Sequence, residues 1–190
     1  MPRFVLLLFV FVLAFSGCRL PTVEYFRTVP TVAVQQPRQK PGMTLVLDRS
    51  IHDTLIIGPP HFKKMRVYSF RQSLAEGLSN AFKCYYDEVK ISDEISATGM
   101  CLEVVDVSPT FNVKSTRLSR VPNSRLTIAE VEAKIPYVVI IYANGAEERR
   151  LSGIAFSALS TFDSDETDMV FKNGIKIMFE EIYRRTTMRY

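Results

Sequence analysis

The 190-residue sequence has few of the residues that most often build metal and cofactor sites. It contains two histidines, three cysteines and no tryptophan. A zinc site needs three or four converging ligands, but His52 and His61 have no cysteine at metal-ligand spacing. We therefore expect both histidines to lie in loops, and we predict no metal and no cofactor.

Common catalytic motifs are absent as well. The sequence has no G-x-S-x-G, G-x-x-x-x-G-K-[ST], G-x-G-x-x-G or H-E-x-x-H segment. The segment from Asp48 to Asp53 does contain Ser50, His52 and Asp53. Catalytic triads converge from distant parts of a fold around an oxyanion hole, and neighbours in one turn do not supply that geometry. We interpret the segment as a polar turn and expect the protein not to be an enzyme.

A strong excess of one charge is also missing. The 24 lysines and arginines nearly balance 20 aspartates and glutamates, which leaves a formal net charge of +4. A nucleic-acid-binding domain usually has a dense basic stripe, so we expect no nucleic-acid partner.

One acidic cluster lies near the C-terminus, but it lacks the D-x-D-x-D-G pattern of an EF-hand calcium loop. Negative charge also stabilises the start of a helix. We therefore interpret the cluster as the N-terminal turn of the last helix. It consists of Asp163, Ser164, Asp165, Glu166 and Asp168.

The N-terminus contains an apolar run that is too short to span a bilayer. Phe4 to Phe15 is an unbroken run of 12 apolar residues, about 18 Å as a helix against a hydrocarbon core of about 30 Å. Arg3 precedes it, and Ser16 and Gly17 follow it. This layout is typical of a secretory signal, so we predict that residues 1–17 are a signal peptide.

The signal ends in a cysteine. The tetrapeptide Phe15-Ser16-Gly17-Cys18 resembles the lipobox of bacterial lipoproteins, although its first position is usually an aliphatic residue. The resemblance implies that the thiol of Cys18 is diacylated and that Cys18 becomes the new N-terminus. The alternative is an ordinary signal that happens to be followed by a cysteine.

Two cysteines then remain in the mature chain, Cys84 and Cys101. An even number suits an oxidising compartment such as the periplasm, where they could form a disulfide. The alternative is a pair of buried thiols, and the sequence does not distinguish the two.

Residues 18–42 precede the domain and contain Pro21, Pro30, Pro37 and Pro41. They show no amphipathic period, so we predict a Pro-rich tether, partly polyproline II, that could reach up to roughly 70 Å. A short strand from Thr31 to Val34 is the alternative.

The first half of the predicted domain, 43–190, combines short strands with one helix. Thr44–Asp48 and Thr54–Ile57 are expected to form a strand pair or one broken strand. Apolar residues at helical spacing predict a helix between Val67 and Tyr86. Ser69 and Gln72 fit a capping box, and Gly77 suggests close packing against a neighbour.

The second half contains the strongest strand signals. Met100 to Val113 is expected to be one strand, and Thr127 to Ile141 places alternating apolar residues on one face. Asn144-Gly145 predicts a type I′ turn, after which Leu151 to Ala158 returns as the partner strand. Pro136 predicts an edge position or a bulge.

The final helix is expected after Phe162, with a buried stripe at Phe171, Ile175, Met178 and Ile182. The order is strands, helix, several antiparallel strands, helix. We therefore predict an α+β fold, a two-layer sandwich in which an antiparallel meandering sheet carries both helices on one face.

Several aromatic residues could either belong to the core or line an apolar groove between the layers. They are Tyr85, Tyr86, Tyr137, Tyr142 and Phe156. The core is the more common place for such residues.

Taken together, the mature chain resembles small outer-membrane lipoproteins of Gram-negative bacteria, especially the YajG-like group and the lipopolysaccharide-assembly (LptE-like) group. The resemblance rests on Cys18, the segments TLVLDRSIHDTLIIG, SFRQSLAEGLSNAF and MCLEVVDVSPTFN, and the hairpin around YANGAEERR with its closing helix. In such lipoproteins an aspartate after the cysteine favours inner-membrane retention. This chain has Arg19 there, so the resemblance implies the periplasmic face of the outer membrane.

The resemblance implies a non-catalytic accessory or binding component of an envelope assembly or transport complex. Its partners would be the membrane, through the lipid anchor, and an envelope protein. Lipopolysaccharide or another anionic glycan is a further ligand, and Arg149 and Arg150 are the residues expected to contact it. The alternative is a structural or regulatory lipoprotein that reaches a peptidoglycan-associated partner across the periplasm.

Overall fold

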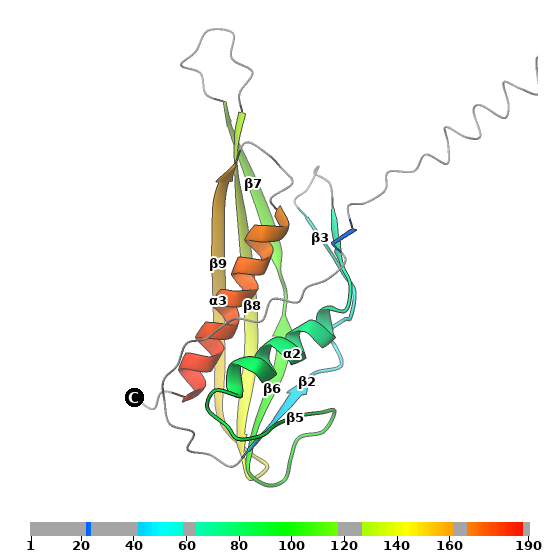
Figure 1. Ribbon diagram of the computed structural model, residues 1–190, viewed down its shortest axis with the longest axis vertical. Helices are drawn as coiled ribbons and strands as arrows, with labels where there is room; N and C mark the ends of the chain where they lie inside the picture. Colours follow the sequence, from blue (N-terminus) through cyan, green and yellow to red (C-terminus); the bar gives the residue numbers. More distant parts are fainter. Residues whose placement is uncertain (1–21, 24–41, 59–63, 118–126, 162–166, 188–190) are drawn as a thin grey trace, which may run out of the picture.

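The structure is a computed structural model, and it describes residues 22–23, 42–58, 64–117, 127–161 and 167–187. Figure 1 shows the helices in front of one long sheet, with a smaller sheet beside them. In chain order the elements are β1 (Thr22–Val23), β2 (Met43–Leu47), β3 (Leu55–Ile57), β4 (Met65–Val67), α2 (Phe70–Phe82), β5 (Val89–Ser92), β6 (Met100–Val107), β7 (Thr110–Arg117), β8 (Thr127–Ala143), β9 (Ala146–Thr161) and α3 (Thr167–Thr187).

The large sheet is built around the long strand β8. On one side β8 pairs with β7 through its first half and with β6 through its second half. On the other side it pairs with β9 along its whole length. The strands β2 and β5 continue the sheet beyond β6, so within the described residues β5, β7 and β9 each have one unpaired side.

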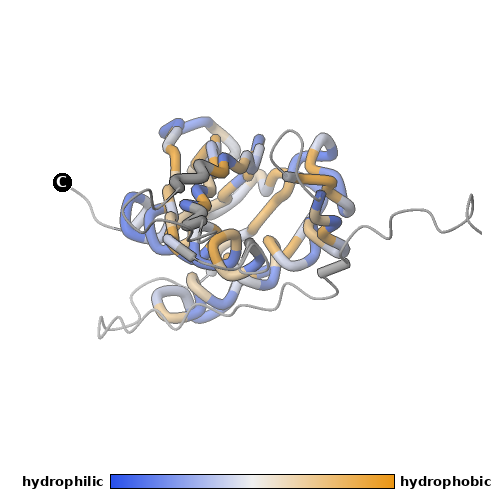
Figure 2. The backbone as a smooth tube through the Cα atoms, turned by 90° about the horizontal axis from the view of Figure 1, so that it is seen from above, coloured by the Kyte–Doolittle hydropathy of each residue, from blue (hydrophilic) through white to orange (hydrophobic). Residues whose placement is uncertain are grey.

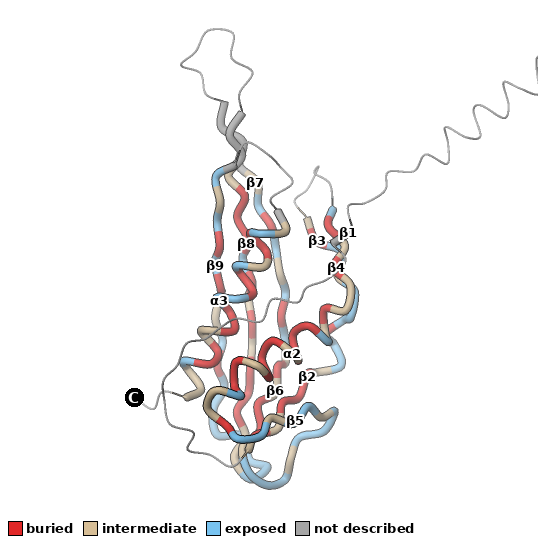
Figure 3. Tube along the Cα trace, in the orientation of Figure 1, coloured by how far each residue is buried: buried red, intermediate tan, exposed pale blue. Residues whose placement is uncertain are grey.

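Both helices cover the same face of this sheet (Figures 1 and 2). The covered face carries the alternating residues of β8, and Figure 3 shows the buried positions recurring along each central strand. All six members of the predicted face from residue 131 onward are buried: Val131, Ala133, Ile135, Tyr137, Val139 and Ile141. The prediction of two helices on one sheet face is therefore confirmed.

The predicted antiparallel meander is wrong for two of the five strand pairings in the large sheet. β2 pairs in parallel with both β5 and β6, whereas β6, β7 and β9 pair antiparallel with β8. Parallel neighbours need a crossover connection, and α2 supplies it between β2 and β5. The sheet is therefore mixed.

The predicted pairing of Thr44–Asp48 with Thr54–Ile57 is also wrong. β3 pairs antiparallel with β4, and β4 pairs in parallel with β1, which makes a separate three-stranded sheet in the order β1-β4-β3. Thr22 and Val23 therefore belong to a strand of the domain, although they lie inside the predicted tether. Residues 24–41 and Cys18 lie outside the described residues.

The predicted long strand from Met100 to Val113 is divided in two at Ser108 and Pro109. This division faces Pro136, whose carbonyl accepts a hydrogen bond from the Ser108 N–H at 3.1 Å. Pro136 is in the interior strand β8 rather than at an edge, and its missing donor lies where the neighbouring ladder is interrupted. The predicted edge position is therefore wrong, and there is no bulge at Pro136 in its pairing with β9, where it lies opposite Ile154 without a register shift.

Helix α2 is shorter than predicted and begins differently. Ser69 has a φ of 50° and makes no side-chain cap hydrogen bond, so the predicted capping box with Gln72 is wrong. Gly77 does pack closely, because a Cβ at this position would overlap the ring of Phe179 on α3, with the ring's Cζ 2.7 Å away. The glycine is what lets the two helices meet.

The β8–β9 hairpin and α3 agree with the sequence. Asn144 and Gly145 both have positive φ values, 52° and 79°, as a type I′ turn requires. The predicted stripe of α3 is fully buried at Phe171, Ile175, Met178 and Ile182. Of the acidic cluster, Asp168 lies in the first turn of α3, and residues 163–166 lie outside the described residues.

Candidate binding site

The segment from Asp48 to Asp53 is a hydrogen-bonded turn after β2. The Ser50 N–H donates to the Asp48 carboxylate at 2.8 Å, and the Ser50 hydroxyl donates to the carbonyl of Val105. Hydrogen bonds from Ser50 lower the pKa of Asp48. The Asp53 carbonyl accepts the N–H of Phe70 at 2.8 Å. The groups are thus used to fix the turn, which agrees with the prediction of a polar turn.

This turn forms one wall of an apolar cavity of about 270 Å³. The cavity lies where β3 of the small sheet faces the interruption between β6 and β7. Ile51, Leu55 and Ile57 line it from one side, and Val107 and Pro109 line it from the other. The apolar side chains of the two sheets do not fill the space beside the interruption.

The rim of the cavity is polar, and among the described residues that line it there is no lysine or arginine. It is formed by Ser50, His52, Asp106, Ser108 and Thr110. The Asp106 carboxylate accepts a hydrogen bond from the Ser108 hydroxyl at 2.6 Å. An apolar interior with one carboxylate at its mouth favours an apolar occupant and disfavours a phosphate or another anion.

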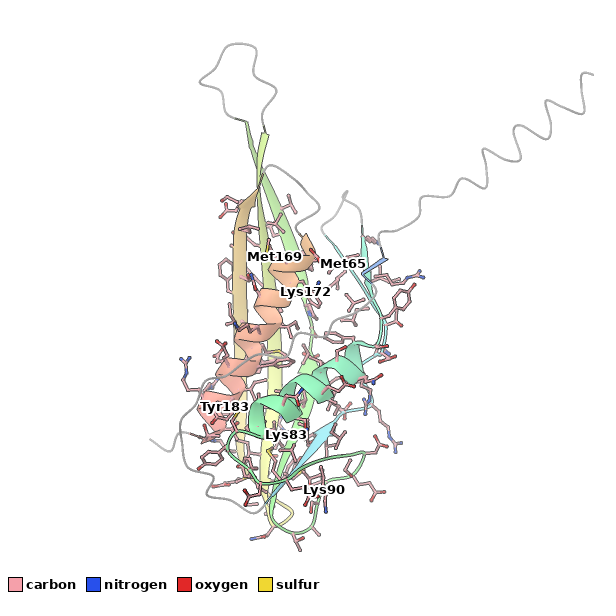
Figure 4. The ribbon with its side chains drawn as sticks, viewed as in Figure 1. Met65, Lys83, Lys90, Met169, Lys172 and Tyr183 are labelled. Atoms are coloured by element: carbon pink, nitrogen blue, oxygen red, sulfur yellow. The ribbon has the colours of Figure 1, made fainter. Side chains whose placement is uncertain are left out.

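Ile56 extends the apolar surface out of the cavity. Its side chain is 53% exposed, although it also lines the cavity. The small sheet therefore offers both a recess and an exposed apolar side chain. Figure 4 shows this sheet around Met65, which is buried on its inner side.

A second hollow of about 390 Å³ lies between α2 and β5, and Arg71 is its cation. The guanidinium of Arg71 donates to the carbonyls of Leu47 and Asp48, and it lies 3.6 Å from the carboxylate of Asp93. Arg71 therefore joins α2 to the end of β2, and both of its terminal nitrogens already donate to backbone carbonyls. This hollow is a structural contact rather than an anion site.

Arg149 and Arg150, predicted to meet an anionic ligand together, point to opposite faces of β9. Arg149 donates to the carbonyl of Arg185 on α3 at 2.7 Å. The Arg150 guanidinium lies 3.4 Å from the carboxylate of Glu147. Successive strand residues face opposite sides of a sheet, so the two arginines do not form one site.

The possible disulfide between Cys84 and Cys101 is not formed, and the structure contains both residues as thiols. Leu102 and Val104 belong to the core under the helices, so Cys101 in the same strand points to the other face. Cys84 follows α2 on the helix side. The sheet separates the two sulfur atoms, and a disulfide needs Cα atoms within about 7 Å. Burial raises the pKa of the Cys101 thiol.

The aromatic residues do not line one groove. Tyr86 and Tyr137 belong to the core beneath the helices, and Tyr85 packs against Tyr86 with ring centroids 5.1 Å apart. Tyr142 has the opposite parity on β8, and its hydroxyl donates to Glu103 at 2.8 Å. Phe156 is 48% exposed on β9. The groove hypothesis is therefore wrong, and the core interpretation is confirmed for Tyr86 and Tyr137.

Sequence reasoning did not find the cavity. Its lining comes from β3, from the turn after β2 and from the β6–β7 interruption, which are far apart in the chain. Pro109 and the Ser50–His52 turn were visible in the sequence, but their proximity depends on how the two sheets are placed. His61, the second histidine, lies outside the described residues.

Across the described ranges, no group of three or more histidine, cysteine, aspartate or glutamate side chains is placed to hold a metal ion. A separate search of the same residues finds no helix with the length and apolar character needed to cross a membrane.

No family model matches the chain, and no curated protein matches it in sequence. Solved structures do show similarity. A minor lipoprotein from Acinetobacter baumannii is 12% identical, covers 78% of this chain and 92% of its own, and has a TM-score of 0.42. Lipoprotein B from Nitrosomonas europaea is 12% identical, with coverages of 78% and 83% and a TM-score of 0.46.

The rare lipoprotein B from Shewanella oneidensis is 13% identical, with coverages of 76% and 92% and a TM-score of 0.42. Likeness at these identities and scores carries no argument about what this chain does.

Proposed function

We propose that this chain is a bacterial outer-membrane lipoprotein, anchored through Cys18 on the periplasmic side, that binds an envelope protein and performs no catalysis. It would act as an accessory component of an assembly or transport complex. The observation that carries the proposal is the apolar cavity between β3 and the β6–β7 interruption.

The cavity lies close to the proposed anchor. Only Arg19, Leu20 and Pro21 separate Cys18 from β1, so the anchor is within about 14 Å of that strand. β4 lies between β1 and β3, and neighbouring strands are about 4.8 Å apart. The β3 wall of the cavity is thus within about 25 Å of Cys18, where an apolar segment of a membrane-associated partner can reach it.

The chemistry of the cavity favours a protein segment over lipopolysaccharide. A phosphorylated glycolipid needs cations beside its anionic groups. The described rim supplies one carboxylate, Asp106, with hydroxyl groups and His52, and no lysine or arginine. The length of residues 18–42 motivated the alternative of a partner across the periplasm. The pairing of β1 with β4 uses part of that length, which supports a partner near the anchor.

The anchor is tested with Cys18→Ser in the full chain. We expect this variant to lose fatty-acid labelling and to move from the membrane fraction to the soluble fraction, because one thiol is the proposed acylation site. A Cys18→Ser chain that still takes up labelled fatty acid would contradict the assignment.

The binding site is tested by placing a photo-crosslinking residue at Ile56 of the lipidated chain in intact cells. Ile91 on β5 is the matched control, because it is 55% exposed and Ile56 is 53% exposed. We expect a defined protein adduct from position 56 and none from position 91. An adduct with lipopolysaccharide, or equal adducts at both positions, would count against a protein partner at the cavity.

A second variant separates binding from folding. His52 is exposed at the cavity rim, so His52→Trp should fill the entrance without disturbing the core. We expect the adduct at position 56 to be lost in His52→Trp and kept in His52→Ala. An unchanged adduct in His52→Trp would show that the partner does not enter the cavity.

A further inference from the structure

Strand β9 is a long open edge of the large sheet. It runs from Ala146 to Thr161 and pairs only with β8 within the described part of the chain. Figure 1 shows it at the margin of the sheet, beside α3. An open edge presents unpaired backbone N–H and C=O groups, which natural proteins usually protect with charges, proline or a short strand.

Pro136 shows which residues of β9 direct their backbone N–H and C=O groups toward β8 and which direct them toward the open edge. The Pro136 carbonyl accepts the N–H of Ser108 on the far side of β8, so it points away from β9. Pro136 is opposite Ile154, which makes this a non-hydrogen-bonded pair. The N–H and C=O of Ile154 therefore face the open edge.

A hydrogen bond to Ser152 gives the same assignment of backbone directions along β9. The guanidinium of Arg185 donates to the Ser152 carbonyl at 2.7 Å, so the backbone of Ser152 also faces away from β8. Alternate residues share this direction. The backbone N–H and C=O groups that have no partner at the edge among the described residues therefore lie C-terminal to Ser152. They belong to Ile154, Phe156, Ala158 and Ser160.

Charged residues protect the open edge of β9 only in its N-terminal part. Glu147, Glu148, Arg149 and Arg150 lie there, and Arg185 covers the carbonyl of Ser152. From residue 151 to residue 161 the sequence LSGIAFSALST has no charge and no proline. In the middle of this stretch, Ile154 is 62% exposed and Phe156 is 48% exposed.

We propose that two copies of this chain pair through β9, antiparallel, about a two-fold axis at Ala155. A two-fold axis requires each surface to be complementary to itself. In this register Ile154 is opposite Phe156 of the second copy, and Phe156 is opposite Ile154. Ser152 is opposite Ala158, but its carbonyl already accepts a hydrogen bond from Arg185, so the exchanged backbone hydrogen bonds are those of Ile154 and Phe156. Both Ile154 and Phe156 have edge-facing backbone groups, so each pair can exchange two hydrogen bonds, and the aliphatic and aromatic side chains meet on the sheet face away from the helices.

The charges fit the same register. Arg150 would be opposite the uncharged Ser160 of the second copy, so the arginines of the two chains do not face each other. The charged ends of the two strands lie at opposite ends of the interface. Between Arg149 and Thr161 of β9, no like charges face each other in this register, so charge repulsion does not oppose pairing of this stretch. This dimer uses a surface distinct from the cavity of the proposed function.

Cysteine cross-linking tests the register. Two differently tagged full-length lipidated chains, one with Ile154→Cys and one with Phe156→Cys, are expressed together in a Cys84→Ser background. We expect an oxidised heterodimer carrying both tags, since the two positions are opposite each other. Two tagged chains that both carry Ile91→Cys, at the β5 edge, should give no such product. An absent 154–156 product, or an equal product at position 91, would overturn the proposal.

A second experiment measures the mass of the detergent-solubilised lipidated chain by analytical ultracentrifugation. We expect a dimer that dissociates at least about tenfold more readily in Phe156→Lys, because the change adds two neighbouring charges at the edge. Ile91→Lys is the matched control and should leave the dimer unchanged. Circular dichroism should show that both variants remain folded, as expected for exposed positions.

A monomer at all concentrations, or a dimer insensitive to Phe156→Lys, would contradict pairing through β9. Cross-links from position 154 to a different protein would replace the second copy with another partner and would also overturn the proposal. Neither result bears on the adduct from Ile56, so failure of the dimer can be distinguished from failure of the proposed binding function.

Discussion

The two helices lie on the same face of one sheet, but they are connected to it in different ways. α3 follows the β8–β9 hairpin and packs on those two strands. α2 carries the chain from the region of β2 to its parallel neighbour β5. The hairpin half is made by segments close in sequence, whereas the crossover half needs distant segments to meet.

The two halves are also held by different contacts. In the hairpin half, apolar side chains pack tightly, and the space beside Tyr137 is left by Gly153. In the crossover half, Arg71 connects α2 to the carbonyls at the end of β2. Gly77 and Phe179 form the point where the halves meet. We therefore expect the hairpin half to be sensitive to side-chain volume and the crossover half to the loss of one polar group.

The largest effect is expected where the halves meet. Gly77→Leu would drive a side chain into the ring of Phe179, because even a Cβ at this position overlaps that ring. We expect the free energy of unfolding to fall by about 3 kcal/mol, because an overpacked core cannot relax fully. Urea unfolding followed by circular dichroism measures this change.

Gln72→Leu, at an exposed position of the same helix, is the matched control and should change stability by less than about 0.5 kcal/mol. Adding Phe179→Ala to Gly77→Leu should cost less than the sum of the single changes. Additive costs would mean that the two residues do not press on each other.

The hairpin half is tested with Gly153→Ala. The new Cβ would overlap the phenol of Tyr137, with the ring carbon that carries the hydroxyl 2.5 Å away. Tyr137 is buried and cannot move aside, so we expect a loss of about 2 kcal/mol by the same unfolding measurement. Ser152→Ala on the same strand keeps its carbonyl and should be nearly neutral. A neutral Gly153→Ala would contradict tight packing in this half.

The crossover half is tested with Arg71→Met. This change keeps much of the side-chain volume but removes the donors to the carbonyls of Leu47 and Asp48. We expect a loss of about 1.5 kcal/mol in the free energy of unfolding. Asp93→Asn should cost little, since Asp93 is exposed and exposed ion pairs contribute weakly. If Arg71→Met and Asp93→Asn lost equal free energy of unfolding, the ion pair with Asp93 would be the stabilising contact, and the hydrogen bonds to the carbonyls would not.

The smallest effect concerns Tyr142, where β8 meets β6. Burial, together with the hydrogen bond to Glu103, raises the pKa of Tyr142 to about 12. A raised folded-state pKa makes a contribution to stability that is present below the ordinary value near 10 and is lost as the pH rises through about 12. Ultraviolet titration should show this late ionisation in the native chain.

The late ionisation should disappear in Tyr142→Phe, and it should move to lower pH in Glu103→Gln, which removes the carboxylate charge. Tyr137 and Tyr183 also have raised pKa values, so the difference between the native and variant curves is the quantity to compare. Identical curves for the native chain and Tyr142→Phe would contradict the assignment.

The hairpin half could be predicted closely because its signals are local. The alternation from Thr127 to Ile141, the Asn144-Gly145 turn and the stripe from Phe171 to Ile182 each fix a structure within a short stretch of chain. The crossover half could not, because a strand's sequence does not state whether its neighbour is parallel. β3 looked like a partner for β2 but pairs with β4, and Ser69 adopts a positive φ instead of capping α2.

The candidate site also could be predicted only where its signal was local in the sequence. Arg149 and Arg150 are adjacent in the sequence, yet they face opposite sides of the sheet. The cavity around Ile51, Ile57 and Val107 had no sequence signature, since its walls come from separate elements. Adjacency in sequence was a poor guide to a shared site, and separation in sequence did not prevent one.

The sequence by itself determined the β8–β9 hairpin and the buried stripe of α3, because each depends on periodicity or turn chemistry within a short segment. It also contains the N-terminal apolar run that ends at Cys18, on which the predicted signal rests. The tertiary structure alone decided the parallel pairing of β2, the separation of Cys84 from Cys101, the cavity beside β3 and the open edge of β9. These features depend on which distant segments become neighbours, and packing of the whole chain sets that choice.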